Sequence, residues 1–63
     1  METFKERLIK EEKDLTEKVH KLDKALLTGE LDIDDTQKTI LRIQLSAMYT
    51  YLICLRERIE RLI

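Results

Sequence analysis

The sequence has no proline and no tryptophan, and its 63 residues include only one glycine, Gly29, and one cysteine, Cys54. A single glycine excludes a glycine-rich phosphate loop. A single cysteine excludes an internal disulfide and is typical of a reducing compartment. The rest of the composition, 40% charged and 43% hydrophobic, is typical of long amphipathic helices rather than a sheet or a disordered tail.

The net charge is also small, at −1 from 12 basic and 13 acidic residues. Such a balance gives no overall field to attract duplex nucleic acid or an acidic membrane. The most apolar stretch, residues 40–55, is shorter than the roughly 20 residues that cross a bilayer and contains Arg42. Residues 1–7 lack the apolar run of a secretory signal. We therefore expect a soluble, intracellular protein with no membrane or duplex nucleic-acid partner.

Residues 40–55 organise the chain, and Arg42 is their only charged side chain. Apolar residues recur at alternating spacings of four and three, which is typical of a helix packed along another helix. This seam consists of Leu41, Leu45, Met48, Leu52, Leu55, Ile59 and Leu62. Apolar and aromatic side chains on both flanks widen the arc beyond the roughly 100° that one partner helix covers. Because small domains also need extra stabilisation, we expect a homo-oligomer, from dimer to hexamer.

The first 28 residues predict another helix. Thr3 and Glu6 fit a capping box, in which the hydroxyl and the carboxylate each bind a backbone N–H, so the helix begins at about Phe4. Its own seam, interrupted by Glu12, consists of Leu8, Leu15, Val19, Leu22 and Leu26. Pairs spaced by four residues, such as Glu6 with Lys10 and Asp14 with Lys18, are expected to be ordinary solvated pairs.

Gly29 suits the end of this helix, and Asp32 or Asp34 suits the cap of the next. The short connection predicts an antiparallel hairpin. The predicted fold is all-α: one domain, residues 1–63, with helices at about 4–27 and 35–62 that assemble as a homo-oligomeric bundle.

No catalytic or metal-binding arrangement is predicted. The segment from Asp32 to Thr36 begins like a calcium loop but lacks its glycine and its bidentate glutamate. Glu17 and His20 share a helical face, as in di-metal bundles, but lie away from the seam, so a surface histidine is expected. Cys54 has no histidine near it in sequence and is expected to be a buried structural thiol. We therefore expect a protein that is not an enzyme and has no cofactor.

Polar and aromatic side chains beside the seam, with two cations at the start of the chain, form the candidate binding set. It consists of Lys5, Arg7, Gln44, Tyr49, Tyr51, Arg56 and Arg58. Arginine matches phosphate geometry, and tyrosine rings stack on bases. Alternatively, the tyrosines pack in an interface and the arginines pair with Glu57 and Glu60. The residues alone favour this second interpretation.

Three segments, residues 4–11, 17–22 and 44–59, carry a family resemblance. The most specific is a run matched by Gln44, Leu45, Ala47, Met48, Tyr51, Leu52, Leu55, Arg58 and Ile59. With these segments, the chain resembles a family of very small bacteriophage proteins, the crAss-like phage related proteins. They belong with the helical-hairpin domain of anti-CBASS and anti-Thoeris sponge proteins.

The resemblance implies a phage homo-oligomer that sequesters a host immune signalling nucleotide, without cleaving it, in the cytoplasm of the infected bacterium. The ligand, a cyclic oligonucleotide or an ADP-ribose-derived messenger, would sit between protomers. Phosphates would be contacted by Arg7, Arg56 and Arg58. Base or ribose would be contacted by Gln44 and by Tyr49 or Tyr51. The alternative is a helical adaptor that binds a host protein by helix packing, with no small ligand.

Overall fold

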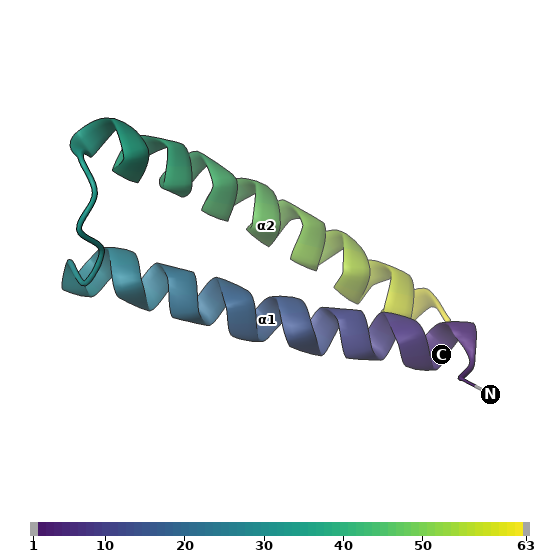
Figure 1. Ribbon diagram of the computed structural model, residues 1–63. Coiled ribbons are helices and arrows are strands. Elements are labelled where there is room, and N and C mark those ends of the chain that lie inside the picture. The colour runs from purple at the N-terminus through teal and green to yellow at the C-terminus, as the bar shows by residue number, and fades with distance from the viewer. Residues whose placement is uncertain (1, 63) are drawn as a thin grey trace.

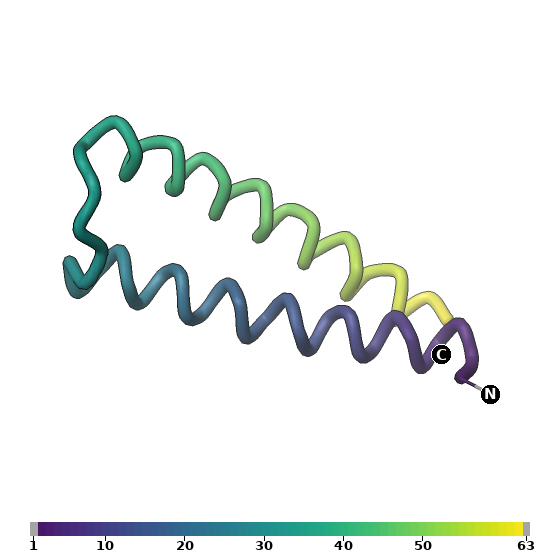
Figure 2. Tube along the Cα trace, in the orientation of Figure 1, coloured from purple at the N-terminus to yellow at the C-terminus, as the bar shows by residue number. Residues whose placement is uncertain are grey.

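The computed structural model describes residues 2–62, which form two α-helices and a short connection. Helix α1 spans Phe4–Thr28 and helix α2 spans Asp35–Arg61 (Figure 1). They run in opposite directions, so the start of α1 lies beside the end of α2 (Figure 2). The predicted antiparallel hairpin is therefore confirmed, with helix boundaries within one residue of those expected.

Both ends of α1 form as the local sequence predicts. The Thr3 hydroxyl accepts a hydrogen bond from the Glu6 N–H at 3.1 Å. Within residues 2–62 the reciprocal bond of the capping box, from the Thr3 N–H to the Glu6 side chain, is not formed. At the other end Gly29 has a φ of 69°, a left-handed conformation that a side chain disfavours, and its N–H bonds to the Ala25 carbonyl. The helix therefore stops at Thr28.

The start of α2 is fixed by an aspartate cap. Of the two candidates it is Asp34 that caps the helix, since its carboxylate accepts from the Gln37 N–H at 2.8 Å. Asp35 follows in the first turn, while Arg58 and Arg61 lie in the last turn. This order matches the helix dipole, whose N-terminus favours negative charge and whose C-terminus favours positive charge.

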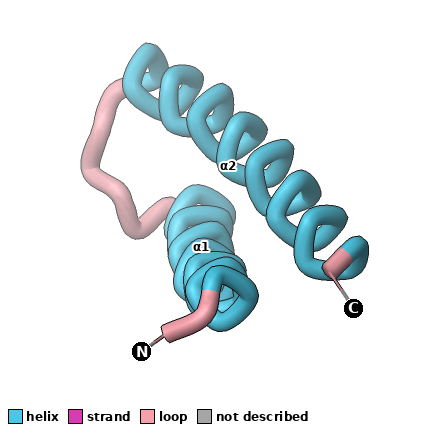
Figure 3. The backbone as a smooth tube through the Cα atoms, turned by 90° about the vertical axis from the view of Figure 1, so that its right-hand side faces the viewer, coloured by secondary structure: helices cyan, strands magenta, loops and turns pink. Residues whose placement is uncertain are grey.

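The core is a line of buried leucine and valine side chains between the helices. It consists of Leu8, Val19, Leu45, Leu52 and Leu55, all of which belong to the predicted seams. Figures 1 and 2 show the helices closest near the chain ends and diverging toward the connection, and in Figure 3 α2 runs obliquely past α1. Seam residues nearer the connection, such as Leu22, Leu26 and Leu41, are accordingly only half-buried.

Two expectations about burial are wrong in the single chain: that Leu62 packs in the seam and that Cys54 is buried. Leu62 is exposed and lies one residue past the end of α2. Cys54 is exposed rather than buried. At about 100° per residue it lies about 200° around the helix from Leu52, on the side facing away from α1. Ile43, 66% exposed, shares that side. The hairpin thus leaves apolar surface of α2 uncovered, as the width of the arc predicts.

Candidate functional site

A groove of about 400 Å³ runs along α1 beside the flank of α2 that carries Tyr51. Its lining residues are Glu2, Arg7, Lys10, Glu11, Asp14, Leu15, Lys18 and Tyr51. Residues 7, 11, 14 and 18 recur every three or four positions and so share one face of α1. We call this site the Tyr51 groove. Its volume lies within the range of roughly 300–1,000 Å³ that is usual for small-molecule sites.

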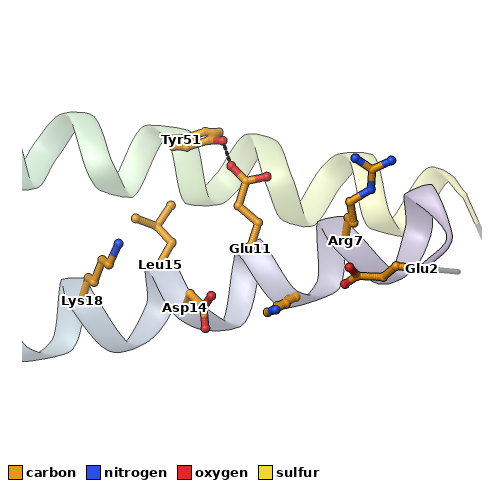
Figure 4. Close-up of a pocket in the computed structure, with 8 residues that line it drawn as sticks. Glu2, Arg7, Glu11, Asp14, Leu15, Lys18 and Tyr51 are labelled. Carbon is orange, nitrogen blue, oxygen red and sulfur yellow. Dashed lines mark hydrogen bonds between the residues drawn. The ribbon is translucent and has the colours of Figure 1, made fainter.

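Tyr51 is held in the groove by a contact between the helices. Its hydroxyl donates a hydrogen bond to the carboxylate of Glu11, which reaches toward it from α1 (Figure 4). The Tyr51 side chain nevertheless remains 45% exposed. The groove therefore presents a positioned aromatic surface on which a planar group can stack.

Charged groups of both signs line the same groove. In chain order they are Glu2, Arg7, Lys10, Glu11, Asp14 and Lys18. The three cations and three carboxylates balance, so the groove has no formal net charge. Within residues 2–62, neither Arg7 nor either lysine has a carboxylate within 4.0 Å, because the two ion pairs found there involve other residues. Donors for an anionic ligand and acceptors for hydroxyl groups therefore lie in the same groove.

The opposite flank of α2 carries a different polar network. The Nε of Arg56 donates to Oε1 of Glu12 at 3.0 Å, and its Nη2 donates to the hydroxyl of Thr16 at 3.4 Å. Thr16 in turn donates to the Glu12 backbone carbonyl at 2.8 Å. The seam position at which Glu12 interrupts the apolar pattern is thus used for an ion pair between the helices.

A second groove, of about 300 Å³, lies on this flank and is lined by Ile9, Glu12, Arg56, Ile59 and Glu60. Its one cation, among the described lining residues, is Arg56, whose guanidinium already binds Glu12. This groove therefore offers an anionic ligand less than the Tyr51 groove does.

The remaining predicted site residues lie outside both grooves. The guanidinium carbon of Arg58 lies 5.8 Å from the centroid of the Phe4 ring, a cation–π contact between the end of α2 and the start of α1. Lys5, Gln44 and Tyr49 are exposed. Of the seven predicted residues, the Tyr51 groove brings together only Arg7 and Tyr51.

Sequence reasoning missed the other six groove residues, which are Glu2, Lys10, Glu11, Asp14, Leu15 and Lys18. Lys10 and Lys18 were expected to pair with Glu6 and Asp14, but neither pair comes within 4.0 Å in the described part of the chain. The available signal was position: Glu11 and Lys18, seven residues apart, share a helical face beside the α1 seam, whereas Lys10 lies about 100° around the helix from Glu11 and gave no such signal. That signal shows a shared face but not which flank of α2 lies next to it.

In residues 2–62 no three His, Cys, Asp or Glu side chains are grouped so that they could hold a metal ion. Neither of the helices described there is long and apolar enough to cross a membrane.

The Sequestin family profile matches residues 2–61, a span that includes both helices and both grooves. The chain belongs to the Sequestin family. The family name denotes sequestration and does not specify what is sequestered. Comparisons with curated proteins and with solved structures give no significant match. Membership of Sequestin confirms the resemblance to a family of sequestering proteins, while the connection with crAss-like phages, CBASS and Thoeris stays a prediction.

Proposed function

We propose that this Sequestin protein binds a host immune signalling nucleotide, either a cyclic oligonucleotide or an ADP-ribose-derived messenger, and withholds it without cleaving it. The observation that carries the proposal is the Tyr51 groove, in which a partly exposed aromatic ring lies among cations that have no carboxylate within 4.0 Å. The family name supports sequestration, and the groove supplies groups suited to a nucleotide.

Each part of a nucleotide has a counterpart in this groove. The guanidinium of Arg7 can bind a phosphate through two parallel hydrogen bonds, with Lys10 and Lys18 as further cations. The ring of Tyr51 can stack on a base. The carboxylate of Asp14 can accept hydrogen bonds from ribose hydroxyls or base amino groups. Because the groove has no net charge, recognition depends on the positions of these groups rather than on a long-range field.

The proposal is tested by isothermal titration of cyclic di- and trinucleotides and ADP-ribose cyclisation products into the protein. At least one ligand is expected to bind. Arg7→Ala should weaken its binding about 10- to 100-fold, the value of one charged hydrogen bond of roughly 1.5–3 kcal/mol. Lys5→Ala is the matched control, because Lys5 is a cation in the same helical turn but outside the groove.

Two further outcomes decide the proposal. Bound nucleotide released by heat denaturation should be chemically intact, as chromatography against the starting compound will show. A degraded ligand would contradict sequestration without cleavage. No heat with any member of the panel would contradict nucleotide binding itself.

A second candidate function is a helical adaptor that occupies a host protein by helix packing. The exposed apolar side chains of α2, with Ile43 at 66% and Ile53 at 60%, favour it. A stable complex with a host protein, together with an absence of nucleotide binding, would support the adaptor over the nucleotide sponge.

A further inference from the structure

The hairpin exposes more surface than a chain of its mass usually does. Its accessible surface is 5218 Å². A folded monomer of 7.6 kDa has about 4,300 Å². The excess, roughly 900 Å², is close to the roughly 800 Å² that each partner buries in a standard protein interface. The hairpin therefore has enough surplus surface for one such interface.

Part of this surplus is an apolar face on the side of α2 that points away from α1. We define this outer face by Ile40, Ile43, Ala47 and Cys54, all of them exposed. Their spacings of three, four and seven repeat the pattern of a packing seam. Alanine at the middle of the face lets a neighbouring backbone approach closely, while the isoleucines supply apolar area.

Charge distinguishes the possible directions of a partner on this face. Asp32, Asp34 and Asp35 lie at the start of α2, and Arg58 and Arg61 lie in its last turn. A second copy running parallel would place like charges side by side. A copy running antiparallel would place the aspartates of each chain beside the arginines of the other, with opposed helix dipoles.

We propose that a second copy of this chain covers the outer face, with the two α2 helices antiparallel and Ala47 on the two-fold axis. In this register Ile40 faces Cys54 of the second copy and Ile43 faces its Tyr51. Large side chains thus meet smaller or flatter ones, and the two alanines meet at the centre. The interface is isologous, so it closes at two chains without leaving a free copy of the same face.

One consequence of this arrangement rests on the proposed function. Tyr51 lies at the edge of the outer face, between it and α1. A two-fold axis perpendicular to the plane of the paired helices keeps corresponding flanks on the same side of that plane. The two Tyr51 grooves then open toward the same side of the pair, where one ligand can contact both.

The oligomeric state of nucleotide-free protein tests the interface. Light scattering coupled to size exclusion, at tens of micromolar, should give about 15 kDa, twice the 7.6 kDa of one chain, or a multiple of that pair. Ala47→Glu should at least halve the mass, because two carboxylates would meet at the axis. Ser46→Glu is the control: it adds the same charge at an exposed neighbouring position, about 100° around the helix.

Circular dichroism should show equal helicity for both variants, since Ala47 and Ser46 are exposed in the hairpin and glutamate is a good helix former. A monomeric wild-type protein would overturn the proposed interface, as would an Ala47→Glu variant with the wild-type mass. Loss of mass in both variants would overturn the assigned register.

Cysteine cross-linking gives a second, independent measurement. In a Cys54→Ser background, Ala47→Cys should form a disulfide-linked pair on mild oxidation, because the two Cβ atoms face each other at the axis. Ser46→Cys in the same background should remain mostly monomeric under the same oxidation. Equal cross-linking at both positions would contradict the register. Neither experiment contains nucleotide, so failure of the interface and failure of nucleotide binding are observed separately.

Discussion

Glu11 and Glu12 are neighbours in the chain, yet they bind partners on opposite flanks of α2. Glu11 accepts from the Tyr51 hydroxyl, and Glu12 forms an ion pair with Arg56. On the Arg56 flank, the positive charge of Arg56 is therefore neutralised by Glu12. On the Tyr51 flank, Arg7 has no carboxylate within 4.0 Å among the described residues. The comparison indicates that one flank mainly joins the helices, while the other has groups left to bind a ligand.

The apolar seam positions both flanks, and removing part of it should have the largest effect. Leu55 has 0% of its surface exposed. Leu55→Ala should lower the free energy of unfolding by about 2–5 kcal/mol, from lost burial and the cavity left behind. A domain this small has little stability to lose. Urea unfolding followed by circular dichroism will measure the change.

Leu27→Ala is the control for this prediction, because Leu27 belongs to α1 but is 81% exposed. Its effect should be within about 0.5 kcal/mol of wild type. Equal stability of the two variants would mean that the helices are not held together by the seam.

The second prediction compares the two tyrosines of α2. Tyr51→Ala should weaken nucleotide binding about 5- to 100-fold, since stacking on an aromatic ring contributes roughly 1–3 kcal/mol per base. Tyr49→Ala should change it less than about two-fold, because this residue lies outside the Tyr51 groove. Tyr51→Phe keeps the ring and loses only the Glu11 bond, so it should retain most of the affinity. A stronger effect at Tyr49 would place the ligand on the other flank.

The helices of this fold could be predicted from sequence because their signals are local. Thr3, Gly29 and Asp34 act on backbone groups within five residues, and seam spacing depends only on helical geometry. The weakening of burial toward the connection could not be predicted. It depends on how far the two helices diverge, and no local pattern encodes that divergence.

The site was predicted less completely for a related reason. Arg7 and Tyr51 could be selected because each combines suitable chemistry with a position beside a seam. The partner of Arg56 was expected to be Glu57 or Glu60 and is instead Glu12, from the other helix. Which α1 carboxylate meets which α2 side chain depends on the rotation of each helix about its axis. Seam spacing separates Glu11 from Glu12 by about 100° around α1, but it does not show which α2 side chain each one meets.

The smallest predicted effect concerns this pair of glutamates. Glu12→Gln should lower the free energy of unfolding by at most about 1 kcal/mol, because it removes a partly exposed ion pair. It keeps an oxygen that can accept from Arg56 and Thr16. Glu11→Gln should cost less, since a glutamine oxygen still accepts from the neutral Tyr51 hydroxyl.

The salt dependence of urea unfolding distinguishes the contributions of Glu12 and Glu11 to the free energy of unfolding. The cost of Glu12→Gln should shrink at high sodium chloride, where exposed charges are screened, whereas that of Glu11→Gln should change little. Nucleotide affinity tests the same division between the flanks. Glu12 does not line the Tyr51 groove, so Glu12→Gln should leave nucleotide binding unchanged. If weakening the contact between Arg56 and Glu12 instead strengthens nucleotide binding, the Arg56 flank contacts the ligand, and the division between the two flanks is wrong.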